Sequence, residues 1–381
     1  MSEIADEDGK RPVKVYFPCT GLGRQRRGFE TFTTEFAAAL ADDPRLSISV
    51  FAGGAVSGAN VHALPNIARD TWLAAMIGRL VRHEPHFVEQ ASFFPSFLPH
   101  LLCGRPDVIY FGDLNLGNIC WHWRRLTGAR YRLLFYNGGA MTTPYTRMDF
   151  VQQLTPSGLS DAIARGEGGE HQVVLPHGIQ VPSALPPRIT GEARAALGLP
   201  VGRLMVLSVG LLDCTVKRMD YLVREVASLD GPRPFLVLLG ATSAETPALR
   251  RLAVDLLGAD GCLISTVTRE ELSRFYQAAD VFALASVREG FGLAYVEALL
   301  HGLPVVAHDS AVTRYVVGAG ESLRALDAPG AAASAIRSAL RLPITEEVRV
   351  ARYASARERF GWDALRGQYA DMLMRVSALP L

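Results

Sequence analysis

The sequence predicts an α/β protein built from two doubly wound parallel-sheet domains in series. Short β-branched or aromatic runs alternate with segments of helical period along most of the 381 residues, a pattern typical of parallel strands covered by helices on both faces. A segment with four prolines, PHGIQVPSALPP at 176–187, interrupts the alternation once. The composition, 49% apolar and 20% charged, is that of an ordinary globular chain long enough for about two or three domains.

In the first half, the run VKVYFP at 13–18 is typical of a buried strand, and a glycine-bearing loop and a helix at 29–40 follow it. A helix is also expected at 71–81. Further strands are predicted at 47–51, 108–111, 131–136 and 172–175.

The proline-rich segment suits neither helix nor strand and marks the domain boundary. We therefore expect one domain at 1–180 and a second at 181–361, with ligands bound where the strands' carboxyl ends face the cleft between them. A final helix at about 362–381 has apolar residues at helical spacing and is expected to pack back on a domain surface. Strands of the second domain are predicted at 204–209, 235–239, 262–265, 281–284 and around 305, with helices at 219–228, 247–257, 270–278 and around 295.

Charge and cysteine usage exclude several classes of protein. Thirty-nine Lys and Arg against 38 Asp and Glu give a net charge of +1, which argues against a dedicated nucleic-acid binder. The five cysteines are scattered and form no C-x-x-C pair, so neither a disulfide framework nor a zinc knuckle is indicated. An acidic, polar start and the lack of any apolar run of 18 residues predict a cytoplasmic protein with at most peripheral membrane contact.

The most informative segment follows the predicted strand at 281–284. Glu289 and Glu297 are separated by seven residues, and Gly290 and Gly292 lie between them. Glycines let the backbone turn tightly and approach a ligand, and a helix starting near Gly292 would direct its first N–H groups at an anion or at hydroxyls. The alternative, two solvated carboxylates about 80° apart on one helix, explains neither the glycines nor the apolar strand that follows.

The string E-G-F-G-L-A-Y-V-E-A-L-L-H-G-L-P-V-V-A resembles the E-x7-E signature of family 4 glycosyltransferases, which adopt the GT-B fold of two Rossmann-like domains facing a cleft. The resemblance implies that the first domain binds an acceptor and the second a nucleotide sugar. It also implies that Glu289 lies beside the donor sugar and that Glu297 holds the ribose. Phe291, Gly292 and Leu293 would offer backbone amides to sugar hydroxyls or phosphate.

A second segment, SVGLLDCTVKRMDYLV at 208–223, is similar to the family's strand and loop that end in a diphosphate-binding lysine. Lys217 is the matching residue, and a cation there would neutralise charge on the leaving group. The family's usual arginine after the strand glycine is replaced by Leu211, and Arg218 is a candidate to compensate. A solvated basic helix start is the alternative for Lys217 and Arg218.

The amino-terminal half matches the family less closely. Gly23 and Gly28 fall where the family has small residues facing donor phosphates, although the glycine spacing is not a dinucleotide fingerprint. Asn137 and Gly138 stand where the family often has a His-Gly pair near the reacting centre. An asparagine can orient a sugar hydroxyl but does not titrate near neutrality. Candidate acceptor residues are Arg24, Arg26, Arg27, Asn137 and Gly138. For the three arginines, solvated side chains are an equal alternative.

The resemblance implies a retaining transfer of a hexosyl-type sugar from a nucleotide diphosphate sugar, with UDP or GDP as the expected nucleotide. Glu289, Lys217 and Asn137 are the candidate catalytic residues of a front-face mechanism. Because the only D-x-D spelling is at 6–8, no metal and no other cofactor is expected. The predicted partners are the sugar donor and a small soluble acceptor such as a specialised metabolite; the oligomeric state stays open.

Four alternatives remain. One is a glycosyltransferase that acts on a lipid-linked or cell-surface glycan, and another is an inactive nucleotide-sugar-binding protein. An epimerase or phosphorylase would share the two lobes but would not depend on an acceptor. A nicotinamide dehydrogenase would need a glycine fingerprint after the first strand, which this chain lacks.

Overall fold

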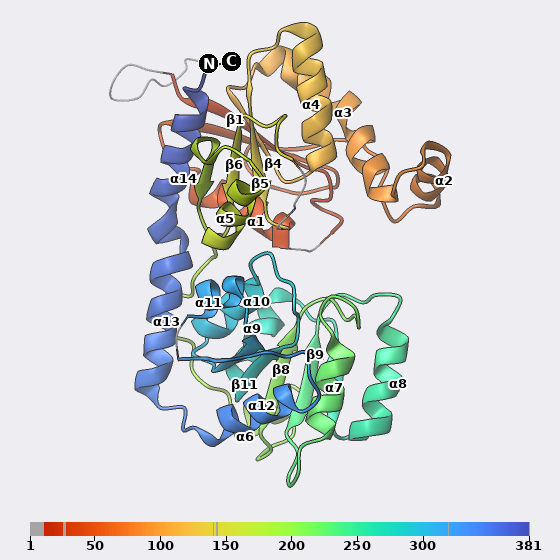
Figure 1. The fold of residues 1–381 in the computed structure, drawn as a ribbon, viewed down its shortest axis with the longest axis vertical. Coiled ribbons are helices and arrows are strands. Elements are labelled where there is room, and N and C mark those ends of the chain that lie inside the picture. The colour runs from red at the N-terminus through yellow and green to blue at the C-terminus, as the bar shows by residue number, and fades with distance from the viewer. Residues whose placement is uncertain (1–10, 26–27, 140, 142–143, 319, 381) are drawn as a thin grey trace. The chain divides into compact units, whose positions relative to one another are not determined.

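The computed structural model describes residues 11–25, 28–139, 141, 144–318 and 320–380. The chain divides into two compact units (Figure 1). The amino-terminal unit comprises Met1–Gln180 together with Gly361–Leu381, and the carboxy-terminal unit comprises Val181–Phe360. The division between Gln180 and Val181 falls inside the proline-rich segment.

The amino-terminal unit contains a parallel sheet in the order β3-β2-β1-β4-β5-β6-β7. This is a doubly wound order, in which β1 pairs with β2 on one side and β4 on the other. The strands of this sheet are β1 (Val13–Cys19), β2 (Leu46–Ala52), β3 (Val61–Ala63), β4 (Val108–Phe111), β5 (Arg132–Asn137), β6 (Phe150–Gln153) and β7 (Gln172–Val174).

The helices of this unit are α1 (Gly28–Ala39), α2 (Trp72–Val81), α3 (Pro85–Gly104), α4 (Leu114–Thr127), α5 (Pro156–Ala164), the short 3-10 helix η1 (Gly169–His171) and α14 (Trp362–Ser377). Sequence reasoning missed α3, which contains Pro95 and Pro99. Proline normally breaks a helix interior, but here buried Phe93, Phe97 and Leu101 anchor α3 in the core.

Helix α14 belongs to the amino-terminal unit although it ends the chain. It packs against β1, β4 and β5. The Trp362 ring stacks on Phe32 at 5.8 Å, and the Tyr369 hydroxyl donates to the Pro176 carbonyl at 2.7 Å. Its apolar face thus completes the cover of this sheet, as its helical spacing of apolar residues requires.

The carboxy-terminal unit has a second parallel sheet, in the order β10-β9-β8-β11-β12-β13. The fold class predicted from the sequence, two Rossmann-like doubly wound sheets, is thereby confirmed. The strands are β8 (Met205–Val209), β9 (Phe235–Leu239), β10 (Cys262–Ser265), β11 (Val281–Leu284), β12 (Val305–His308) and β13 (Ser322–Arg324). The helices are α6 (Gly191–Ala195), α7 (Met219–Ala227), α8 (Thr246–Leu257), α9 (Arg269–Ala278), α10 (Leu293–Leu300), α11 (Ala311–Val317), α12 (Ala331–Arg341) and α13 (Glu346–Phe360).

Both cores lie between a sheet and its helices. Every residue of β4, β9 and β11 is buried, as expected of central parallel strands. Charged residues, among them Lys217 and Glu289, lie in the loops that follow the carboxyl ends of β8 and β11. Among the described residues no helix is both long and apolar enough to cross a bilayer.

Candidate functional site

An ion pair joins the loops that follow two neighbouring strands of the carboxy-terminal unit. Strands β8 and β11 pair in parallel, with Val206 opposite Val281, so their carboxyl ends meet at one edge of the sheet. Lys217 lies in the loop after β8 and Glu289 in the loop after β11. The Lys217 Nζ is 2.5 Å from Oε1 of Glu289, and the two side chains are 21% and 9% exposed. The structure thus brings together two residues that sequence reasoning assigned to one site.

Gly210 and Asp213 shape the loop that carries Lys217. Gly210 follows β8, and a Cβ at Gly210 would lie only 3.2 Å from Cγ of Lys217. The buried carboxylate of Asp213 accepts hydrogen bonds through Oδ1 from the backbone N–H groups of Val216 at 3.0 Å and Lys217 at 2.6 Å. The glycine thus leaves room for the lysine stem, and the aspartate fixes the backbone from which this stem projects.

Helix α10 begins directly after a tight glycine turn. Gly292 precedes the helix with φ +86°, and a Cβ there would lie 2.4 Å from Cδ2 of Tyr295. Only glycine fits such a position. Phe291 is buried, with its ring edge-to-face against Phe360 at 5.4 Å. Leu293 starts the helix. The Tyr295 N–H donates to the Gly292 carbonyl at 3.0 Å, and the first N–H groups of a helix, which precede such bonds, favour an anion or hydroxyl oxygens.

Tyr295 is an unusual member of this turn. Its side chain is fully buried, and its hydroxyl has no hydrogen-bond partner within the described residues. Burial, and then the negative charge of Glu289, raises the pKa of Tyr295 well above its ordinary value. The phenol is therefore neutral at any physiological pH.

The second glutamate of the motif is held by two aromatic side chains of its own unit. The Tyr276 hydroxyl donates to Oε2 of Glu297 at 2.8 Å, and the Tyr276 ring stacks on His301 at 4.9 Å. His301 Nδ1 lies 2.7 Å from the Glu297 carbonyl and its Nε2 lies 2.9 Å from Ser273 Oγ. Burial lowers the pKa of His301, so the ring is neutral at pH 7. It links the Glu297 backbone to Ser273 by hydrogen bonds.

Arg218 contacts backbone carbonyls of its own unit. Its Nη1 donates to Ala285 O at 3.3 Å and to Leu326 O at 2.6 Å, and its guanidinium lies 4.3 Å from the ring centroid of Tyr221. Leu211, at the position of the arginine expected from the resemblance, is 41% exposed. The guanidinium of Arg218 thus braces the loop after β11.

The predicted residues of the amino-terminal unit have varied surroundings. Gly23 has φ +85°, and a Cβ there would lie 2.8 Å from the backbone of Gly54. Gly28 starts α1, and its carbonyl oxygen lies 3.4 Å from Nε2 of His177. Arg24 is exposed and donates to Oδ1 of Asn66. Arg26 and Arg27 lie outside the described residues.

Asn137 ends β5 and is buried. Its Nδ2 donates to the Tyr145 hydroxyl at 2.8 Å and to Gln153 Oε1 at 2.9 Å, while its Oδ1 accepts from Met141 N at 2.8 Å. At the next position, a Cβ on Gly138 would lie 2.1 Å from Cε1 of Tyr136. The amide of Asn137 therefore holds the loop after β5, and its catalytic and acceptor-binding roles stay predictions.

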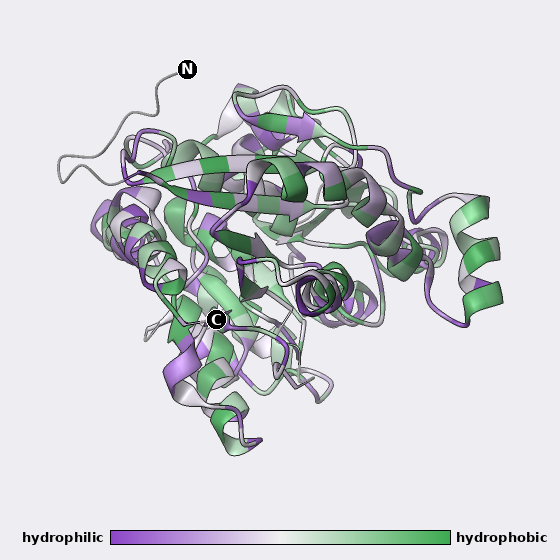
Figure 2. Ribbon diagram, turned by 90° about the horizontal axis from the view of Figure 1, so that it is seen from above, coloured by the Kyte–Doolittle hydropathy of each residue, from purple (hydrophilic) through white to green (hydrophobic). Residues whose placement is uncertain are grey.

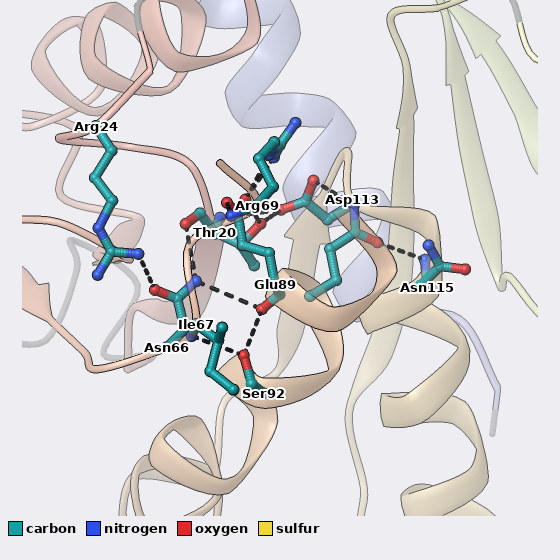
Figure 3. Close-up of polar contacts among 10 residues, drawn as sticks. Thr20, Arg24, Asn66, Ile67, Arg69, Glu89, Ser92, Asp113 and Asn115 are labelled. Carbon is teal, nitrogen blue, oxygen red and sulfur yellow. Dashed lines mark hydrogen bonds and ion pairs between the residues drawn. The ribbon is translucent and has the colours of Figure 1, made fainter. Parts of the chain in front are cut away.

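A buried polar network that sequence reasoning missed lies at the carboxyl ends of β1 and β4 (Figure 3). Thr20 donates to Oδ2 of Asp113 from its N–H at 3.0 Å and from its hydroxyl at 2.7 Å. Gln90 Nε2 donates to Asp113 Oδ1 at 3.0 Å, and Arg69 pairs with Glu89 at 2.5 Å. Burial raises the pKa of Asp113. The network ties the end of the sheet to α3.

A cavity of about 600 Å³ opens beside this network, within the amino-terminal unit. Gln90 belongs to the network and also lines the cavity. Its Oε1 accepts from the backbone N–H of Asn115 at 3.1 Å. The lining residues include amides, a hydroxyl, a histidine and an arginine, and they are His86, Gln90, Gly112, Leu114, Asn115, Asn118, Met141, Pro144, Thr146 and Arg147. Within the described ranges, no group of three or more His, Cys, Asp or Glu side chains is arranged to hold a metal ion.

Some of the missed residues carry a signal in the sequence. Asp113 follows the strand-like run 108–111, and polar residues after buried strands are candidates for a site at the sheet edge. Asp213 precedes Lys217 in the quoted loop, but only the backbone geometry reveals which N–H groups it holds. Tyr276 and Tyr295 have no such signal, because tyrosines at helical spacing are usually core residues.

Residues 190–359 match the family model of glycosyl transferases group 1. The chain is 32% identical over 213 residues to a D-inositol 3-phosphate glycosyltransferase of Kineococcus radiotolerans, covering 50% of this chain and 49% of that protein. For the enzyme of the same name from Stackebrandtia nassauensis the identity is 30% over 269 residues, covering 62% and 59%. The chain thus spans about half the length of these relatives.

Solved structures resemble both units. Sucrose-phosphate synthase from Thermosynechococcus elongatus matches with a TM-score of 0.77 at 19% identity, covering 96% of this chain and 99% of that one. Anabaena HepE in complex with UDP-glucose matches with a TM-score of 0.72 at 18% identity, covering 95% and 100%. At such identities the likeness concerns the fold, which is the GT-B fold expected from the sequence.

Proposed function

We propose, from the match of residues 190–359 to the family model of glycosyl transferases group 1, that the chain transfers a hexosyl-type sugar from a nucleotide diphosphate sugar to an acceptor, with retention at the anomeric carbon. The observation that carries the proposal is the Lys217–Glu289 pair beside the start of α10. A cation, a carboxylate and the N–H groups at the start of a helix, all at one sheet edge, suit a diphosphate joined to a sugar.

The proposed chemistry needs no covalent intermediate. Lys217 Nζ binds the diphosphate, and the N–H groups of Phe291, Gly292 and Leu293 bind phosphate or sugar oxygens. The acceptor oxygen attacks the anomeric carbon on the face from which the diphosphate departs. The carbon–oxygen bond to phosphate breaks, its electron pair goes to the diphosphate, and a diphosphate oxygen takes the acceptor's proton. Lys217 stabilises the charge that develops on this leaving group.

The two glutamates have separate roles in this proposal. Glu289 accepts hydrogen bonds from hydroxyls of the donor sugar once the diphosphate has drawn Lys217 Nζ away from its carboxylate. Glu297, oriented by Tyr276, accepts the ribose hydroxyls of the nucleotide. Lys217 and Arg218 share one loop, but Arg218 acts by bracing the backbone rather than by touching phosphate.

We take UDP as the first nucleotide to test and GDP as the second. Support for UDP comes from solved structures of similar fold that hold this nucleotide, among them Anabaena HepE with UDP-glucose. A structure titled trehalose-6-phosphate from E. coli, bound with UDP-2-fluoro glucose, has a TM-score of 0.68. No metal is invoked in the proposed mechanism, because the lysine and the helix N–H groups supply the positive potential that the diphosphate requires.

The acceptor is proposed to bind in the cavity beside α3 and α4 and to be a small soluble molecule. Asn115, Asn118 and Thr146 offer neutral hydrogen-bonding groups to hydroxyls, and Arg147 offers a positive charge. The matched relatives are named for transfer to D-inositol 3-phosphate, which is a small polyol of this kind. The cavity is proposed in addition to the acceptor candidates predicted from the sequence, which are Arg24, Arg26, Arg27, Asn137 and Gly138.

A second candidate, a lipid-linked or cell-surface acceptor, is favoured by the surface of α2. Trp72, Met76 and Leu80 form one stripe along this helix and are 75%, 51% and 83% exposed. Figure 2 shows α2 as a largely hydrophobic helix at the edge of its unit. Exposed Arg79 adjoins the stripe, and such a combination is typical of helices that lie at an anionic membrane surface. Co-sedimentation with anionic vesicles, lost in Trp72→Ala/Leu80→Ala, would favour this candidate over a soluble acceptor.

Thermal shift against UDP, GDP, ADP, TDP and CDP without added metal tests the donor site first. We expect one nucleotide to stabilise the protein selectively, because ligands that bind only the folded state raise the melting temperature. Glu297→Ala should lose this shift, whereas Glu347→Ala, an exposed glutamate of α13, should keep it. A folded protein that responds to none of the five nucleotides would refute the proposed donor site.

Turnover with the corresponding sugar donor is the second arm. Lys217→Ala and Glu289→Ala should each lower the rate of transfer by orders of magnitude, while the far-ultraviolet circular dichroism stays that of the wild type. A protein that binds nucleotide but transfers no sugar to any acceptor, and hydrolyses none, would instead be a nucleotide-sugar-binding protein.

A further inference from the structure

We propose that Ser286 is a positioning residue that sets the separation of Lys217 and Glu289. Its hydroxyl bridges the two loops that carry these residues. The inference rests on the proposed donor site for its catalytic consequence, but the positioning itself can be measured without any activity.

The contacts of Ser286 are placed one residue before each member of the ion pair. Ser286 lies just beyond β11 and is 1% exposed. Its Oγ is 2.9 Å from the carbonyl of Val216 and 3.0 Å from the carbonyl of Arg288. Val216 directly precedes Lys217, and Arg288 directly precedes Glu289. A single buried hydroxyl proton is therefore shared between the backbones of both loops.

Packing of side chains cannot replace this bridge at Val216. Val216 is 52% exposed, so burial of its side chain contributes little to holding the residue in place. Its backbone is held instead on two sides, with its N–H bonded to Asp213 Oδ1 at 3.0 Å and its carbonyl bonded to Ser286. Asp213 holds the loop after β8 within itself, whereas Ser286 connects this loop to the other one.

Arg218 supplies a second link between the same loops, to the carbonyl of Ala285 at 3.3 Å. This link is longer, and it falls after Lys217 in the chain rather than before it. Loss of the Ser286 hydroxyl should therefore leave the loops attached but free to shift by a fraction of an ångström. Displacements of about 1 Å in a reacting constellation can lower rates about 100-fold.

The hydroxyl, rather than the volume of the side chain, is the group that acts in this proposal. Ser286→Ala removes it, and Ser286→Thr keeps it. Ser228→Ala is the matched control, because Ser228 Oγ also donates to a backbone carbonyl, that of Glu225 at 2.8 Å, at the end of α7.

The first measurement is a double-mutant cycle on stability, with Lys217→Met and Glu289→Gln, in the wild-type, Ser286→Ala and Ser228→Ala backgrounds. If Ser286 sets the geometry of the pair, the coupling between Lys217 and Glu289 should fall to less than half in Ser286→Ala and stay unchanged in Ser228→Ala. Equal coupling in all three backgrounds would overturn the proposal, whatever the protein's activity.

The second measurement separates positioning from simple stability. We expect Ser286→Ala to lower kcat at least tenfold and to change the dissociation constant of the nucleoside diphosphate less than threefold, with Ser286→Thr recovering most of kcat. A loss of melting temperature with kcat unchanged would show a merely structural role and overturn the proposal. A wild-type protein that neither binds nucleotide nor transfers sugar would refute the proposed function instead, and the stability cycle would still decide the role of Ser286.

Discussion

Removing the Tyr276 hydroxyl tests whether Glu297 is held ready for a ribose. Tyr276→Phe deletes one oxygen from a side chain that is 2% exposed and leaves the ring stacked on His301. The lost hydrogen bond, 2.8 Å to Oε2 of Glu297, has a carboxylate acceptor. Hydrogen bonds to charged groups contribute about 1.5–3 kcal/mol. Because Glu297 is only half-buried, we expect a loss of unfolding free energy near the lower end, about 1.5 kcal/mol.

The effect on nucleotide affinity follows from the freedom that the carboxylate gains. Ordering one flexible side chain on binding costs about 0.5–1.5 kcal/mol, and about 1.4 kcal/mol corresponds to a tenfold change in a dissociation constant. Tyr276→Phe should therefore weaken binding of the nucleoside diphosphate by roughly 2-fold to 10-fold. Isothermal titration calorimetry measures the affinity, and urea unfolding followed by circular dichroism measures the stability.

Tyr221→Phe is the matched control for this prediction. The Tyr221 hydroxyl donates at 2.8 Å to the backbone carbonyl of Ala328, in the same unit but at no residue proposed to bind ribose. It should lower stability slightly and leave the affinity unchanged. If Tyr276→Phe bound the nucleotide as tightly as the wild type, or if both variants lost affinity equally, the assignment of Glu297 to the ribose through Tyr276 would be wrong.

Three further outcomes are expected. Tyr295→Phe should unfold at the same free energy as the wild type or up to about 1 kcal/mol higher, since its buried hydroxyl makes no hydrogen bond within the described residues; a clear loss in chemical denaturation would contradict this. Gly210→Ala should lower turnover about tenfold with little change in melting temperature, because the new Cβ would lie 3.2 Å from Cγ of Lys217 and displace this side chain. Turnover equal to that of the wild type would show that the lysine side chain has room. His301 has a pKa lowered by burial, so the unfolded state binds its proton first and stability should fall as the pH drops below about 6.5. His301→Gln should flatten this part of the stability curve, and identical curves would refute the argument.

The sequence predicted most of the fold because its signals are local. Strand runs such as those at 13–18 and 281–284 are bounded by glycine or polar residues, and helical periodicity marks the segments between them. Helix α3 was not predicted, because Pro95 and Pro99 disfavour a helix locally. The burial of Phe93, Phe97 and Leu101 outweighs that local preference, and burial of this kind cannot be read from neighbouring residues alone.

The candidate site divides in the same way. Glu289 and Glu297 stand out by their spacing and by the glycines between them, whereas Lys217 was identified through its resemblance to the family's diphosphate-binding lysine. The sequence could not predict that Asn137 donates hydrogen bonds to Tyr145 and Gln153. Those partners come from β6 and from the loop that precedes it. The same holds for Arg218, whose guanidinium binds the carbonyl of Leu326, 108 positions further along the chain.

By itself, then, the sequence determined two parallel α/β sheets, the proline-rich boundary between them and the charged residues that follow β8 and β11. Periodicity and turn chemistry suffice for this, because each acts over a few neighbouring positions. Only the tertiary structure decided which atoms meet: Lys217 with Glu289, Tyr276 with Glu297, and Ser286 with the carbonyls of both loops. Those contacts depend on the order and register of the strands, which bring together segments that lie far apart in the chain.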